Sequence, residues 1–182
     1  MTAGELYSFL DERFPVDLRA EWDNDGLMYC LDKNKSVKKV LITLDVTVEC
    51  IEYAAKNGYD TIVSHHPLIF RPLSCLDFSG AVGKRLKMIL KNDITVMSFH
   101  TRLDCCLVNQ SLAEVLGFEN IREFELDGLP MGRIGEIGAM NIEAFAEHVK
   151  KALGADTVNY PACFNKPIKK VALLGGSGGD AQ

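Results

Sequence analysis

Strand-like and helix-like segments alternate along the chain, and this order restricts the sequence to a small set of folds. The apolar segment 37–46 precedes an amphipathic segment, 47–58, in which Thr47 is a typical N-cap and Gly58 a typical helix end. The order of strand, helix and strand then repeats through residues 61–100. Because helical connections place successive strands in parallel, we predict an α/β fold with parallel or mixed sheets flanked by helices.

A change in composition suggests that the chain forms two lobes. The first lobe is predicted to begin with a helix at 3–13 and to end with a helix at 104–118 and a strand at 121–126. The sequence DGLPMG that follows concentrates glycine and proline, which is typical of a boundary. We therefore predict lobes at residues 1–127 and 128–182.

The second lobe is predicted to hold one helix, capped by Asn141, and strands before and after it; these segments are 133–140, 141–154, 156–160 and 170–174. The last strand has the apolar run of a buried central strand, which needs cover on both faces. We therefore expect the second lobe to be truncated here and the natural protein to continue past residue 182.

Composition excludes several classes of protein. A hydrophobic content of 47%, a charged content of 25% and a mean hydropathy of +0.03 are typical of a soluble globular chain. No segment approaches the roughly 18 apolar residues of a membrane helix, and the acidic N-terminus is unlike a signal peptide, so we predict a cytoplasmic protein. The six cysteines form no CxxC pair, which disfavours disulfide and zinc-thiolate frameworks. The net charge of −5 disfavours broad nucleic-acid binding.

Three of the four histidines end predicted strands. His65 and His66 finish one strand and His100 the next, so a parallel sheet brings all three to the same carboxyl edge. Pro67 ends the first strand, which allows both adjacent imidazoles to turn toward one crevice. Asp104 follows at the start of the next helix, where a carboxylate is favoured. Imidazole and carboxylate together suit zinc, iron, manganese or nickel, which would activate water.

A structural interpretation competes with metal binding, because many polar side chains simply occur where strands reach the surface. It suits any one of these histidines taken alone. Two adjacent histidines followed by a His-x-x-x-Asp sequence favour a metal site for the group. His148, on the polar face of a predicted helix, keeps the structural interpretation.

Other patterns are weaker. Gly176, Gly178 and Ala181 match a loose dinucleotide-binding pattern, but no helix follows them, which favours a tight turn. Cys105 and Cys106 begin a predicted helix, where thiolates are favoured, although packing in the helix core is the simpler use. The sequence EWDNDGL, residues 21–27, predicts an anchored loop that could also rim the crevice.

The sequence resembles the Nif-three-like family, the GTP cyclohydrolase I type II homologues. The resemblance covers essentially the whole chain and lies in WDNDGL (22–27), LDVT (44–47), SHHPLIF (64–70), HTRLD (100–104), GRIGEIGAM (132–140) and KKVALLGGSGG (169–179). It implies two similar α/β lobes facing a cleft, a site for two divalent metal ions and a ring-like homohexamer. By motif matching, His65, His66 and Asp104 are metal ligands, and His100 is a further ligand or a residue that supports them.

The chain departs from the family at two places. The family completes its metal site with a C-terminal histidine and glutamate, and residues 105–182 hold no matching pair. We expect that pair in a longer natural chain. Arg102 stands where the family commonly has asparagine, so we expect it to alter the charge of the pocket.

Two functions are consistent with these residues. The first is a metal-dependent hydrolase that acts on a small nucleotide-like or cyclic amide substrate, with His100 as the candidate proton-handling group. The second is a non-enzymatic metal-binding scaffold, carrier or regulatory protein, which needs ligands alone.

Overall fold

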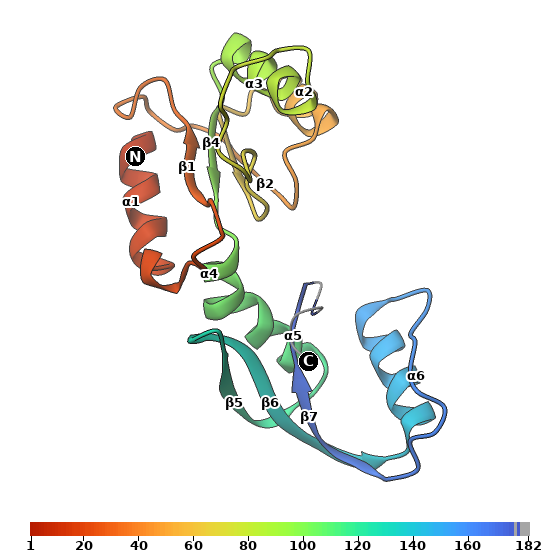
Figure 1. Ribbon diagram of the computed structural model, residues 1–182. Coiled ribbons are helices and arrows are strands. Elements are labelled where there is room, and N and C mark those ends of the chain that lie inside the picture. The colour runs from red at the N-terminus through yellow and green to blue at the C-terminus, as the bar shows by residue number, and fades with distance from the viewer. Residues whose placement is uncertain (177, 179–182) are drawn as a thin grey trace. The chain divides into compact units, whose positions relative to one another are not determined.

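The computed structural model describes residues 1–176 and residue 178. Contacts divide the chain into two compact units, Met1–Leu103 and Asp104–Gln182, which are taken one at a time below. Each unit combines a β-sheet with α-helices, and the sheets are mixed and antiparallel (Figure 1). The predicted α/β class is therefore confirmed.

The first unit is built on a four-stranded sheet in the order β1-β4-β3-β2. Strands β2, β3 and β4 are parallel, and β1 pairs antiparallel with β4. The elements are α1 (Ala3–Arg13), a 3-10 turn (Val16–Leu18), β1 (Gly26–Tyr29), β2 (Val40–Thr43), α2 (Val48–Lys56), β3 (Thr61–Ser64), α3 (Ala81–Asn92), β4 (Thr95–Ser98) and α4 (Thr101–Leu103).

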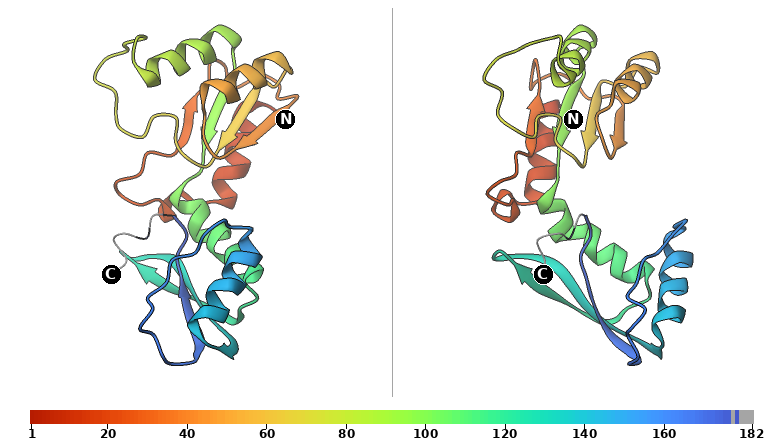
Figure 2. Two further views of the ribbon diagram at one scale, coloured as in Figure 1. Left: turned by 90° about the vertical axis from the view of Figure 1, so that its right-hand side faces the viewer. Right: turned by 45° about the vertical axis from the view of Figure 1, so that its right-hand side comes forward.

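Helices cover both faces of this sheet (Figure 2). Ile62 and Val96 are partners in the β3–β4 register and belong to a hydrophobic cluster with α2 and α3. The next pair, Val63 and Met97, belongs to a second cluster with α1. Successive strand residues point to opposite faces, so strands that are apolar at every position need this cover on both sides.

The second unit contains a three-stranded antiparallel sheet in the order β5-β6-β7. Helices α5 and α6 contribute to one hydrophobic cluster with all three strands, centred on Ala113, Leu116 and Phe118. The elements are a π-helical segment (Asp104–Val108), α5 (Asn109–Val115), β5 (Glu119–Leu126), β6 (Leu129–Met140), α6 (Ile142–Leu153) and β7 (Ile168–Leu173).

Helix starts were predicted well from capping residues. The Thr47 side chain accepts a hydrogen bond from the Cys50 amide at 3.1 Å and begins α2. The Asn141 side chain accepts from the Ala144 amide at 2.8 Å and begins α6. Both predicted N-caps are therefore confirmed.

Two predictions of strands need correction, and one strand was missed. Residues 156–160 form no strand, and β1 was not predicted. Strand β7 lies at one edge of the described sheet and is only partly buried, whereas we expected a buried central strand. An apolar run indicates that a strand is at least partly buried. Whether the strand lies at the centre or at the edge of a sheet depends on which distant segments pair with it.

The boundary between the two compact units lies earlier in the sequence than the boundary between the predicted lobes. The predicted boundary falls in the β5–β6 hairpin turn, where Asp127 and Gly128 have φ values of 52° and 76°. Positive φ at both positions is typical of a tight hairpin turn. Hairpin turns and linkers favour the same residue types, so the sequence alone did not distinguish them. The division into lobes 1–127 and 128–182 stays a prediction beside the contact-defined units.

Two further observations concern predictions made along the chain. Among the described residues, every helix is too short or too polar to cross a bilayer. The loose glycine pattern at residues 176–181 ends at Ala181, which lies outside the described residues.

Candidate metal centre

The ends of two neighbouring parallel strands bring three histidines together. Ser64 of β3 and Ser98 of β4 are register partners; His65 and His66 follow Ser64 directly, and His100 lies two residues after Ser98. The ring centroids of these histidines are 4.9, 5.0 and 5.4 Å apart. Backbone hydrogen bonds from His65 to Thr43 and from His66 to Leu44, 3.1 and 2.9 Å long, hold this turn against β2. The predicted convergence of the histidines is confirmed.

The donor set of this cluster fits a divalent metal ion. One nitrogen from each of His65, His66 and His100 lies within 4.8 Å of the others, and all three residues are half-buried. Imidazole nitrogen binds zinc and other transition metals at about 2.0–2.1 Å. Small rotations of the rings would bring all three nitrogens to one shared ion, and their spacing also suits two neighbouring ions. The three histidines could therefore hold metal.

The local environment favours the neutral, metal-binding form of one of these rings. Burial lowers the pKa of His65, and repulsion from His100 and His66 lowers it further. A neutral imidazole keeps the lone pair that a metal requires. His65 is therefore in its ligand form at neutral pH.

A buried carboxylate orients His100. One Asp23 oxygen lies 3.0 Å from His100 Nδ1, and the other accepts from the Thr101 amide and hydroxyl at 3.1 and 2.8 Å. Burial raises the pKa of Asp23, but hydrogen bonds from His100 and Thr101 outweigh it and lower the pKa below its usual range. Because this carboxylate accepts a hydrogen bond from Nδ1–H, the lone pair of the neutral His100 ring is on Nε2.

His66 has a carboxylate partner as well. Its Nδ1 lies 2.8 Å from Oδ1 of Asp45, and about half of each side chain is exposed. A histidine that gives one nitrogen to a carboxylate and keeps the other for a metal is a common arrangement at metal sites. The sequence analysis did not select Asp23 or Asp45, although both lie inside the quoted motifs WDNDGL and LDVT.

The expectation that Arg102 alters the charge of the pocket is wrong. Its side chain is fully buried and pairs with Asp11 at 2.6 Å and with Asp25 at 3.0 Å. Asp25 Oδ2 also accepts from the His100 amide at 2.9 Å. Burial would lower the pKa of Arg102, but Asp11 and Asp25 raise it, so the guanidinium stays charged within its own ion pairs. Arg102 thereby anchors the loop that carries Asp25, whose carboxylate contacts the His100 amide.

The remaining candidates lie in the second unit. Asp104 begins its π-helical segment and is half-buried; its role as a metal ligand stays a prediction. His148 Nε2 lies 2.8 Å from the Leu116 carbonyl oxygen, which agrees with a structural role. Cys105 is buried, and burial, followed by the neighbouring Cys106, raises the pKa of its thiol to about 11. Packing rather than reactivity is therefore the use of Cys105.

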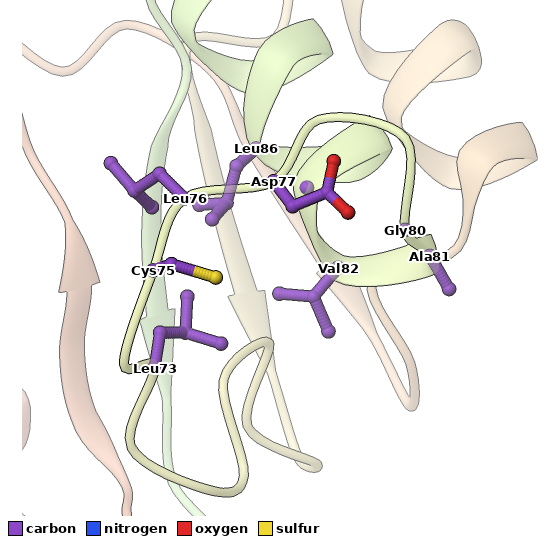
Figure 3. A pocket seen from close by; sticks show the side chains of 9 residues that line it. Leu73, Cys75, Leu76, Asp77, Gly80, Ala81, Val82 and Leu86 are labelled. Carbon is purple, nitrogen blue, oxygen red and sulfur yellow. The ribbon is translucent and has the colours of Figure 1, made fainter.

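An apolar pocket of about 270 Å³ lies between α3 and the loop that precedes it (Figure 3). Leu73, Leu76, Val82 and Leu86 line it with Cys75 and Asp77. It contains none of the three clustered histidines, so the histidine cluster is a separate feature of the first unit.

Comparison with known proteins agrees with this fold. The family model DUF34/NIF3 (NGG1p interacting factor 3) matches residues 1–182. The chain belongs to the DUF34/NIF3 family. Its DUF34/NIF3 relatives include the GTP cyclohydrolase 1 type 2 homolog of Clostridium perfringens, 33% identical over 189 residues, which cover 99% of this chain and 71% of the relative.

Two other proteins extend this relationship. The GTP cyclohydrolase 1 type 2 homolog of Methanocaldococcus jannaschii is 36% identical over 98% of this chain and 72% of its own length. The crystal structure of the Staphylococcus aureus hypothetical protein SA1388 matches with a TM-score of 0.85 and 31% identity. That match covers 98% of this chain and 73% of the solved chain. The fold shared with this solved protein therefore extends over 98% of the chain.

Proposed function

We propose that this protein is a metal-dependent hydrolase acting on a small nucleotide-like or cyclic amide substrate. The observation that carries the proposal is the convergence of His65, His66 and His100 at one sheet edge, with their ligand nitrogens within 4.8 Å. The GTP cyclohydrolase 1 type 2 homolog names of the relatives support the substrate class.

In this proposal His65 and His66 bind the metal, and Asp104 joins them by its match to the family motif. Zinc, iron, manganese or nickel suits these ligands, with two ions in the complete family site. A bound divalent ion would lower the pKa of a water molecule and polarise the bond under attack.

His100 is the group best placed to handle a proton or to add a ligand. Asp23 holds Nδ1 at 3.0 Å, which orients the ring and leaves the lone pair on Nε2. In either role the Asp23 carboxylate determines which nitrogen is available. Its second oxygen is held by Thr101, so the orientation is set before any ligand binds.

The first experiment measures bound metal. Purified protein is loaded with zinc or manganese, desalted and subjected to elemental analysis beside the His65→Ala, Asp104→Ala variant. We expect the variant to lose most of its metal. His148→Ala is the matched control, since that histidine contacts the Leu116 carbonyl and lies outside the cluster. Equal metal content in all three proteins would rule out this site.

The second experiment separates an enzyme from a carrier. Metal-loaded protein is incubated with a panel of nucleotides and cyclic amides, and products are followed by liquid chromatography. Hydrolysis that disappears in His65→Ala supports the enzyme. Metal binding without turnover across the panel would favour the scaffold or carrier instead.

We also propose a cytoplasmic homohexamer, on the strength of the family resemblance. Sedimentation velocity of the purified protein tests the assembly directly. A monomer at all concentrations would contradict the hexamer without affecting the metal proposal.

A further inference from the structure

Two aromatic side chains remain exposed beside the histidine cluster. Trp22 is 59% exposed and Phe70 is 45% exposed, although residues of this kind are usually covered. Their ring centroids lie 6.1 Å apart, and they lie 5.9 and 6.5 Å from the His100 ring. We call Trp22 and Phe70 the aromatic pair. Both of its rings meet the same imidazole nearly at right angles, at 73° and 76°.

The backbone that carries the aromatic pair is firmly held. The Asn24 side chain donates to the Ile69 carbonyl at 2.5 Å and so joins the loop of Trp22 to the loop of Phe70. The Asp23 carboxylate ties the same loop to Thr101, as described above. The two exposed rings are thus carried by linked loops next to a candidate metal site. Free loops would let them turn inward and bury apolar surface.

We propose that the aromatic pair binds a planar, conjugated ring of the substrate. The inference rests on the proposed function, because the ring would bring a carbonyl or ring nitrogen to the histidine cluster. Aromatic side chains stack with planar rings, and this contact favours flat conjugated systems over puckered saturated ones. Both rings of the aromatic pair lie next to His100, so a ligand ring that stacks on them would also lie next to the histidine cluster.

Binding is tested with two cyclic amides that differ at one ring bond, and therefore in planarity and conjugation. Uracil is flat and conjugated, whereas 5,6-dihydrouracil has similar polar groups on a puckered ring. Trp22 is the only tryptophan in the chain, so its fluorescence reports directly on the aromatic pair. In zinc-loaded protein we expect saturable quenching by uracil and binding of 5,6-dihydrouracil that is weaker by about fivefold or more.

Variants then locate the contact. Phe70→Leu keeps the Trp22 signal and an apolar side chain but removes one ring, so uracil affinity should fall roughly 5- to 100-fold. Trp22→Leu, followed by calorimetry, should give a loss of similar size. Tyr53→Leu is the control: Tyr53 is 53% exposed, but its ring neighbour is Tyr59 rather than a histidine.

The outcomes separate this proposal from the metal proposal. Zinc is measured in every sample, so absence of zinc rejects the metal site itself. Equal affinity for the two amides, or saturable binding of neither in zinc-loaded protein, overturns the aromatic pair as a ring site. A Trp22→Leu protein that binds uracil normally but sediments differently would also overturn it, and would assign the pair to a protein contact.

Discussion

A fully buried arginine lies in each compact unit, Arg102 in the first and Arg133 in the second. Arg102 pairs with two carboxylates, Asp11 and Asp25, and also donates to the Phe14 carbonyl at 2.9 Å. Arg133 instead donates mainly to neutral acceptors, namely the carbonyl oxygens of Pro130, Gly132 and Cys105 and the side-chain oxygen of Gln110.

The difference links one arginine, but not the other, to the candidate metal centre. Asp25 accepts from Arg102 and from the His100 amide with the same oxygen, at 3.0 and 2.9 Å. The network of Arg102 therefore continues into the backbone of a clustered histidine. The partners of Arg133 lie within the second unit, in β6, in α5 and at the start of the π-helical segment. Equal burial thus serves stability and site geometry in one unit, and stability in the other.

Arg102→Met should have the largest effect on folding. Removing one member of a buried ion pair leaves a buried charge without compensation, here Asp25, which costs roughly 3 to 5 kcal/mol. We expect the free energy of unfolding to fall by this amount in urea titrations followed by Trp22 fluorescence, which reports on the first unit. Metal affinity should fall as well, because Asp25 also positions His100.

Arg102→Lys is the control for charge. It keeps the positive charge but cannot reproduce both contacts of the planar guanidinium, so we expect an intermediate loss. If both variants had the wild-type free energy of unfolding, the ion pairs of Arg102 would not stabilise the first unit.

Arg133→Met should destabilise the second unit by less, about 1 to 3 kcal/mol, because the groups left without a donor are uncharged. Its nearest carboxylate, Glu123, is exposed and 3.4 Å away, so that ion pair adds little. Far-ultraviolet circular dichroism during urea unfolding measures the loss. Zinc affinity should stay at the wild-type value. A drop in affinity comparable to that of Arg102→Met would remove the distinction between the two arginines.

Asp23→Asn should act on the metal centre more than on folding. The amide keeps the size of the carboxylate but no longer supplies the negative charge that holds His100 Nδ1. Loss of such a carboxylate partner typically reduces metal affinity about 10- to 100-fold. Competition with a zinc-binding dye measures the change, and Asp17→Asn, an exposed carboxylate of the same unit, is the control. Unchanged affinity in folded Asp23→Asn would show that Asp23 does not position His100.

Much of the first unit could be predicted from sequence because its strands, helices and helix caps are determined by residues close together in the chain. Alternating strands and helices implied parallel pairing, and parallel pairing placed His65, His66 and His100 at one edge. The partners of these residues could not be predicted in the same way. Asp23 is 77 residues from His100, and no periodicity links them. The pairing of Arg102 with Asp11 spans 91 residues and was missed for the same reason.

The second unit was harder to predict because antiparallel pairing depends on contacts that short segments do not encode. The glycine and proline of residues 127–132, which we interpreted as typical of a lobe boundary, form a hairpin turn and the start of β6. Phe124 covers Gly132 across that hairpin; a Cβ added at Gly132 would lie 2.0 Å from the Phe124 ring. This cross-strand fit explains a glycine within β6, where its sequence suggested a break.

The smallest expected effect compares the two helix caps that sequence did predict. Thr47→Ala and Asn141→Ala each remove one side-chain acceptor at a helix start, which costs about 1 kcal/mol. Trp22 fluorescence should report the first loss, and circular dichroism both. Thr47→Ser and Asn141→Asp keep an acceptor and should retain most of the stability. Thr47 lies two residues after Asp45, the partner of His66, yet it contacts only its own helix in this role. A cap change at Thr47 should therefore leave zinc affinity intact. If it weakens zinc binding while α2 stays folded, the metal centre of the first unit includes the start of that helix, and the contrast with Asn141 becomes one of function as well as stability.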